Sequence, residues 1–190
     1  MKKSFLGLGA FLIACFVTAQ VPQGKGNGNT GKETKTATAP TKEESNIIKT
    51  GDKAPSITVK SDKNPVMPQE LKGKVVLVNL FATWCGPCQT ELAEIEKTLW
   101  PEFKDNKQFR MLTIGREHDD SELAKYNKKK GFSFPLYPDK DRSIYNQFAK
   151  SYIPRTYLIG KNGKVVYTSV GFNEEEFKQL MTKIREELKK

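Results

Sequence analysis

The chain has 190 residues, with 32 basic and 22 acidic side chains and a formal net charge of +10 at pH 7. The lysines are scattered and are joined by neither interleaved aromatic residues nor an arginine cluster, so the positive charge does not indicate nucleic-acid binding. Solvated helix faces account for most of the charge, and a mild attraction to anionic membrane surfaces or acidic partners is its other implication.

The first residues have the pattern of an export signal. A short basic stretch, Met1–Lys3, precedes an apolar run, Phe5–Val17, which has the length of a signal peptide and is too short to span a membrane. Small residues before Gln20 favour cleavage after Ala19. We therefore expect residues 1–19 to be a signal peptide and the mature protein to be exported to the bacterial periplasm.

A lipid anchor is the alternative at this end. Leu12-Ile-Ala-Cys15 resembles a bacterial lipobox, in which Cys15 would carry lipid. Phe16 and Val17 continue the apolar run beyond Cys15, which favours ordinary cleavage. Membrane attachment is therefore expected only if Cys15 is lipidated.

Residues 20–50 are predicted to form a disordered linker. Their composition shifts to Gly, Thr, Asn, Lys and Pro with almost no apolar residues, which leaves nothing from which to build a core. The segment would be a tether if Cys15 carries lipid and a tail otherwise. The remaining residues, 51–190, have the size of one domain with one hydrophobic core.

The domain is predicted to open with a short alternating strand, Ser56–Lys60, and a loop, Val66–Lys74. The next stretch, Val75–Phe81, is apolar and rich in β-branched residues and is broken only by Asn79, which predicts a strand buried on both faces of a mainly parallel sheet. Apolar residues at helical spacing then predict a helix that ends before Pro101.

Two cysteines, Cys85 and Cys88, lie where this strand gives way to the helix. The free amides and the positive dipole end of a helix N-terminus would stabilise a thiolate at Cys85. Cys88, one turn further on, could attack the mixed disulfide that Cys85 forms with a substrate. Removal of residues 1–19 leaves no other cysteine, so the pair predicts a dithiol that cycles with a disulfide.

Other uses of such a pair are less well supported. A zinc site would need a second Cys or His cluster, which the sequence lacks. A static disulfide would close almost no loop and so gain little stability. A copper site with His118 as third ligand is the remaining alternative, since thiolates and imidazole suit copper. The main expectation is that His118 is a solvated loop residue and that the protein holds no metal or cofactor.

The rest of the chain alternates strands and helices and closes with a hairpin and a helix. The predicted order is a strand at Phe109–Ile114, a helix from a cap at Ser121 towards Lys130, a short strand within Gly131–Pro138, a helix capped by Asp141, a hairpin of Thr156–Ile159 and Val165–Ser169, and a final helix capped by Asn173. This succession predicts an α/β fold.

At Trp84-Cys-Gly-Pro-Cys88, directly after an apolar strand, the sequence resembles the thioredoxin superfamily. Through Cys85-x-x-Cys88-x-x-Glu91 and the lead-in Val78–Trp84 it resembles the exported TlpA/ResA-type thiol-disulfide oxidoreductases. The resemblance extends from residue 51 to the end of the chain. It implies a thioredoxin-like fold, with a central mixed sheet flanked by helices and an inserted α/β unit between the two halves.

The resemblance also implies a substrate-binding surface. Pro154 matches the cis-proline that lies against the cysteine pair, where the backbone of Ile153 could pair with an extended substrate strand. Trp84 would provide a flat apolar surface beside the sulfurs, or else serve in packing. Arg155 departs from the family, in which a threonine commonly follows the proline, and this puts the substrate contact at that position in doubt.

Glu91 lies three residues after Cys88, on the same side of the helix. If that side is buried, the carboxylate could exchange a proton with the Cys88 thiol and tune the pKa values of the pair. The resemblance supports this role. The alternative is an exposed first-turn glutamate that the helix dipole favours.

Together these features predict a monomeric exported thiol-disulfide oxidoreductase in which Cys85 attacks and Cys88 resolves. The Gly86-Pro87 dipeptide, shared with reducing thioredoxins, and the TlpA/ResA resemblance favour a reductant of specific protein disulfides, for example at the haem-attachment cysteines of c-type cytochromes. Its electrons would come from a membrane donor. A disulfide oxidase or isomerase, and a Cu(I)-delivery protein, are the alternative functions.

Overall fold

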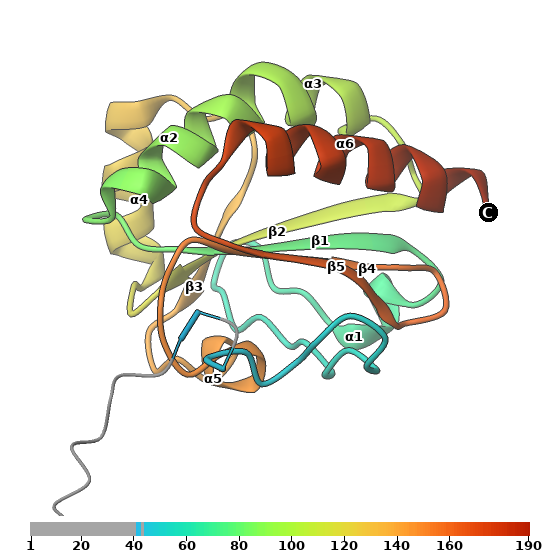
Figure 1. Ribbon diagram of the computed structural model, residues 1–190. Coiled ribbons are helices and arrows are strands. Elements are labelled where there is room, and N and C mark those ends of the chain that lie inside the picture. The colour runs from blue at the N-terminus through green and yellow to red at the C-terminus, as the bar shows by residue number, and fades with distance from the viewer. Residues whose placement is uncertain (1–40, 43) are drawn as a thin grey trace, which may run out of the picture. The chain divides into compact units, whose positions relative to one another are not determined.

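The computed structural model describes residues 41, 42 and 44–190. At its centre lies a five-stranded sheet with the strand order β3-β2-β1-β4-β5 (Figure 1). β1, β2 and β3 are parallel, whereas β4 and β5 are antiparallel to their neighbours. The strands are β1 (Val75–Phe81), β2 (Phe109–Arg116), β3 (Leu136–Asp139), β4 (Arg155–Ile159) and β5 (Val165–Val170). The predicted mixed sheet is therefore confirmed.

Helices cover both faces of this sheet (Figure 1). One face carries α2 (Gly86–Glu94), the π-helical turn η1 (Ile95–Leu99), α3 (Trp100–Phe103), α4 (Asp120–Lys130) and α6 (Glu174–Lys189). The other face carries α1 (Pro68–Leu71) and α5 (Tyr145–Phe148). The unit formed by α4 and β3 is the predicted insertion, and β3 extends the parallel edge of the sheet.

The central strand β1 is buried along its whole length, as predicted. Side chains alternate across a strand, so β1 contributes to two hydrophobic clusters. Val75, Leu77 and Phe81 join the cluster beneath α2 and α6, and Val76, Val78 and Leu80 join the cluster beneath α5. The strand thereby holds both layers together and delivers its carboxyl end to the cysteine pair.

The prediction that the active-site helix ends before Pro101 is wrong. The chain stays helical from α2 through η1 into α3, with Pro101 in the first turn of α3. Proline is tolerated in a first turn, and the wide π turn just before it interrupts the ordinary hydrogen-bond ladder that a proline would break. Trp100, the first residue of α3, packs with its ring edge-on to Phe134 at 6.2 Å between centroids.

The first predicted strand is also absent from the sheet. Ser56–Lys60 makes one isolated bridge, between Val59 and Val66, although Ile57 and Val59 are buried as the alternation predicted. Pairing beside β2 is taken by β3, so this segment covers the sheet and does not extend it. The predicted loop that follows contains the short helix α1.

Two helix caps differ from the predictions by two residues. Asp119, not Ser121, caps α4 in a reciprocal capping box with Glu122. Asp139, not Asp141, accepts hydrogen bonds from the amides that begin α5. The predicted cap of α6 at Asn173 is confirmed by bonds from two first-turn amides.

Part of the predicted linker belongs to the domain. Ser45 is buried, and the buried Arg155 guanidinium donates hydrogen bonds to the side chains of Ser45 and Asn46. This buried role accounts for the arginine after Pro154. The predicted signal peptide, Cys15 and the linker up to residue 40 lie outside the described residues.

Candidate active site

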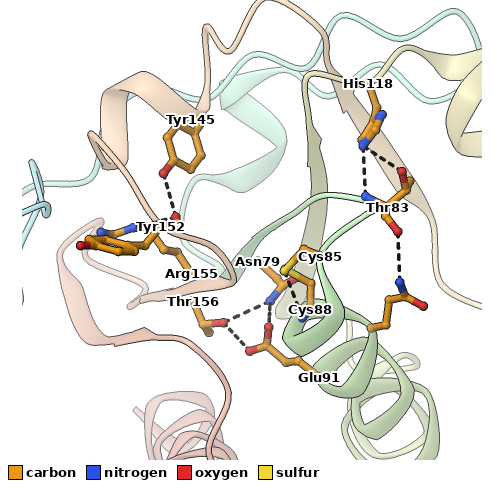
Figure 2. The surroundings of a disulfide bond; sticks show 11 residues. Asn79, Thr83, Cys85, Cys88, Glu91, His118, Tyr145, Tyr152, Arg155 and Thr156 are labelled. Atoms are coloured by element: carbon orange, nitrogen blue, oxygen red, sulfur yellow. Dashed lines mark hydrogen bonds between the residues drawn. A yellow bond between two sulfur atoms is a disulfide. The ribbon is translucent and has the colours of Figure 1, made fainter. Parts of the chain in front are cut away.

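The cysteine pair forms a disulfide at the N-terminus of α2 (Figure 2). Cys85 is the N-cap residue, and its sulfur accepts a hydrogen bond of 3.2 Å from the Cys88 amide. Cys88 is fully buried, whereas Cys85 retains 6% exposure. Cys85 is therefore the sulfur that an incoming disulfide can reach, and it lies where the helix amides stabilise a thiolate.

Glu91 lies beneath this pair with 3% exposure, so the alternative of an exposed first-turn glutamate is wrong. One carboxyl oxygen accepts a bond of 2.8 Å from the Asn79 amide nitrogen, and the other accepts a bond of 2.9 Å from the Thr156 hydroxyl (Figure 2). Asn79 also donates to the Thr156 hydroxyl oxygen at 3.1 Å. The three side chains form a closed buried network.

The register of the sheet creates this network. Asn79 on β1 lies opposite Thr156 on β4, and Thr156 in turn lies opposite Ser169 on β5. Residues directly opposite on adjacent strands point to the same face, which here is the face covered by α2. Sequence reasoning noted Asn79 only as a break in an apolar run and did not select Thr156, so both residues were missed as partners of Glu91.

Burial raises the pKa of Glu91 to about 7, even though the hydrogen bonds from Asn79 and Thr156 act in the opposite direction. A carboxyl with such a pKa is present in both its neutral and its ionised form near neutral pH. It can therefore give up or accept a proton at the pH where thiol-disulfide exchange takes place.

The second side of the site comes from the loop before β4. The Ile153–Pro154 peptide bond is cis, as the resemblance implied. Ile153 packs against the hydrophobic cluster that contains both cysteines. The preceding residue, Tyr152, is 41% exposed, and Trp84 is 62% exposed with the Arg116 guanidinium 5.4 Å from its ring centroid. Two exposed aromatic side chains thus belong to the segments that adjoin the disulfide.

His118 is buried, so the expectation of a solvated loop histidine is wrong. Its Nε2 atom accepts a hydrogen bond of 3.1 Å from the Thr83 amide (Figure 2). A copper ligand would need a free ring nitrogen. Nε2 is bonded to the Thr83 amide, and the other ring nitrogen, Nδ1, faces the Glu122 carboxylate at 3.7 Å. Among the described residues, no three His, Cys, Asp or Glu side chains are grouped as metal ligands would be.

Comparison with known proteins identifies the family. The Redoxin family model matches residues 49–184. The chain belongs to the Redoxin family. Over 129 residues it is 31% identical to the thiol-disulfide oxidoreductase ResA of Bacillus cereus (strain ZK / E33L), a match that covers 66% of this chain and 72% of ResA.

Solved structures place this Redoxin family member among thioredoxin-like proteins. A candidate protein disulfide isomerase from Bacteroides thetaiotaomicron is 34% identical with a TM-score of 0.73, and the match covers 77% of this chain and 94% of that one. The thioredoxin domain of a Bacteroides vulgatus thiol-disulfide oxidoreductase shares the fold at 23% identity, with a TM-score of 0.61 and coverage of 72% and 99%. The chain is a thiol-disulfide oxidoreductase with a thioredoxin-like fold.

The raised pKa of Glu91 makes a prediction for stability. Between the ordinary pKa of 4.5 and about 7, the folded protein holds a proton that the unfolded chain has released. This stabilisation is complete below pH 4.5 and is lost as the pH rises through 7. The oxidised wild type should lose on the order of 3 kcal/mol over that range relative to Glu91→Gln, as measured by urea unfolding at each pH.

Glu174→Gln, which changes an exposed glutamate of α6, is the matched control and should follow the wild-type pH dependence. Parallel stability curves for the wild type and Glu91→Gln would show that Glu91 ionises at an ordinary pKa, contrary to this assignment.

Proposed function

We propose that this chain reduces disulfides of specific exported proteins. The Cys85 thiolate attacks one sulfur of a substrate disulfide and releases the other as a thiolate, forming a mixed disulfide. Cys88 then loses its proton and attacks the Cys85 sulfur, which releases the second substrate sulfur and forms the Cys85–Cys88 disulfide. Two electrons pass to the substrate in each cycle. The observation that carries the proposal is that Cys85, the more accessible sulfur of the pair, lies at a helix N-terminus above a buried, hydrogen-bonded Glu91.

Glu91 is proposed to take the proton that Cys88 must lose. Cys88 is buried, so its ionisation without a nearby base would be costly, and Glu91 lies one helical turn away on α2. A small pocket between β5 and α6 reaches Glu91 and is lined in part by Ser169, Asn173 and Glu176. Such a pocket would let the carboxyl exchange its proton with solvent.

Trp84, Ile153 and Pro154 are proposed to bind the substrate. The backbone of the residue before a cis-proline can pair with an extended peptide, which would hold the substrate strand beside Cys85. The exposed Trp84 ring would cover the apolar part of that strand. Protein thiols and disulfides are therefore the proposed partners, and a monomer would suffice.

The direction of electron flow is inferred from the Gly86-Pro87 dipeptide and from the resemblance to TlpA/ResA-type proteins. Gly86-Pro87 is shared with reducing thioredoxins. The name of the Bacillus relatives, thiol-disulfide oxidoreductase, fits either direction. A reductant working outside the cytoplasm needs an electron source, for which we propose a membrane donor. The haem-attachment cysteines of c-type cytochromes are the proposed example of a substrate.

A disulfide isomerase or oxidase is the second candidate. It is favoured by one relative, the Bacteroides thetaiotaomicron protein described as a candidate protein disulfide isomerase. The same two cysteines would serve, but with a less stable disulfide. The equilibrium reduction potential distinguishes the two functions.

The reductant should have a potential near the value of about −270 mV that thioredoxin shows, measured in a thiol redox buffer at pH 7. A value near about −120 mV, that of the oxidant DsbA, would overturn the proposed direction and make this chain a disulfide donor or isomerase. The fold and the cysteine assignments would be unaffected.

The roles of the two cysteines are tested by trapping. A reduced Cys88→Ser variant should form a stable mixed disulfide between Cys85 and a disulfide substrate such as insulin, because no resolving thiol is present. Mass spectrometry should detect the adduct and its loss on treatment with dithiothreitol. The matched Cys85→Ser variant should form little adduct, since Cys88 is buried. The opposite pattern would reverse the assignment.

Export is proposed from residues 1–19, with lipidation of Cys15 as the alternative. In residues 41, 42 and 44–190, no helix has both the length and the apolar character needed to cross a membrane. The mature N-terminus purified from the native bacterium should be Gln20. A mass that corresponds to a diacylated Cys15 would instead establish the lipid-anchored form, and an intact Met1 would contradict export.

A further inference from the structure

We propose that His118 is a positioning residue for the thiol-disulfide reaction: in its neutral form it holds the turn that presents Cys85, and its protonation releases that turn. This histidine is buried, and neither the cysteine chemistry nor Glu91 accounts for its burial. Its ring contacts the peptide unit of Thr83, two residues before Cys85.

The backbone of Thr83 is held from both sides. Its amide donates to His118 Nε2 at 3.1 Å, and its hydroxyl lies 3.3 Å from the same nitrogen (Figure 2). Its carbonyl accepts a bond of 3.2 Å from the Gln89 side chain, on α2. His118 therefore attaches the turn between β1 and α2 to the loop after β2, and Gln89 attaches the same turn to α2.

The loop that carries His118 is itself fixed. The His118 amide donates to the Gly115 carbonyl at 3.2 Å, and the His118 carbonyl accepts from the Asp139 amide at 3.1 Å. The neighbouring Glu117 amide donates to the Asp139 carbonyl at 2.9 Å. Since β2 and β3 hold the backbone on both sides, the imidazole is anchored to the sheet and can position the Thr83 peptide unit.

The bond to Thr83 exists only in the neutral ring. An amide donor needs the lone pair of Nε2, so the ring proton must reside on Nδ1. Protonation places a second hydrogen on Nε2, which would then face the hydrogen of the Thr83 amide. The imidazolium would lose that bond and gain an ion pair with Glu122, whose carboxylate lies 3.7 Å from Nδ1. Protonation thus moves the ring's interaction from the active-site turn to α4.

The two side chains that hold Thr83 differ in whether they can take up a proton. Gln89 does not titrate, and it also accepts a bond of 2.6 Å from Lys130. The elements around the ring carry further charged groups. Arg116 ends β2 and Glu117 follows it on the loop. Asp119 caps α4, which carries Asp120, Glu122, Lys125 and Lys128–Lys130, and Asp139 and Lys140 lie at the end of β3. His118 is therefore the side chain of this two-sided attachment that can take up a proton.

Amide hydrogen exchange in the full-length oxidised protein tests the attachment directly. The Thr83 protection factor should fall about three- to tenfold as the pH drops through the midpoint at which the His118 ring titrates, because one hydrogen bond is lost. The Leu158 amide, in the buried strand β4, is the internal reference: its protection should rise and not fall as the pH drops, because protonation of Glu91 stabilises the fold. The pH dependence of Thr83 exchange and the protonation of the His118 ring are recorded on the same NMR sample.

Two variants separate hydrogen bonding from packing. His118→Gln can place an acceptor where Nε2 lies but cannot be protonated, so it should keep high Thr83 protection at every pH. His118→Phe retains the ring but has no acceptor, so it should show low protection at every pH. Should His118→Gln not fold, the wild-type comparison with Leu158 still decides. The proposal is overturned if Thr83 shows no step, or if His118→Phe keeps wild-type protection.

Activity provides a second readout. The rate at which the reduced protein attacks a disulfide should carry an acid limb at the His118 midpoint, with a three- to tenfold loss below it. His118→Gln should lack this limb and retain the limb due to Cys85 ionisation. Identical pH profiles would show that the attachment does not affect the reaction. Because the exchange measurement uses the oxidised protein alone, its result is independent of the proposed direction of electron flow.

Discussion

The buried Glu91 carboxyl is the constraint on which the active site depends. A carboxyl removed from water is costly unless it is hydrogen-bonded or neutral, and this protein uses both means. Asn79 and Thr156 satisfy the two oxygens, and the raised pKa allows the neutral form near pH 7. The register between β1 and β4 must bring those partners together beneath α2, so the same residues pair the strands and hold the Glu91 carboxyl.

Strand β4 links this network to the rest of the domain. Successive side chains of a strand point to opposite faces. Thr156 therefore points to Glu91, whereas Arg155 points to the other side and binds Ser45 and Asn46. The cis bond to Pro154 ends directly before this strand. One short segment thus carries the cis-proline, one member of the buried Glu91 network and the residue that binds Ser45 and Asn46.

Local patterns predicted the fold well, because β1, the hairpin and α6 follow from hydrophobic periodicity and turn residues. The place of the cysteine pair was predictable because it follows an apolar strand and precedes residues at helical spacing. What failed depended on contacts between distant residues. Asn79 and Glu91 are 12 residues apart, and Asn79 and Thr156 are 77 apart, so no local pattern could join them. His118 was predicted to be solvated because its neighbours in the sequence are polar, but it is buried. The helix was predicted to end before Pro101 because the sequence does not indicate the π turn that precedes this proline.

The most direct test of this account is the ionisation of Glu91 itself. Carbon-13 NMR can follow the side-chain carboxyl of Glu91 through a pH titration of the oxidised protein, with Glu91→Gln identifying the resonance. A midpoint near 7 is the predicted result, since the buried network holds the proton at neutral pH. A midpoint near the ordinary value of 4.5 would contradict the central claim, because Glu91 would then be a fixed charge and not a proton partner for Cys88.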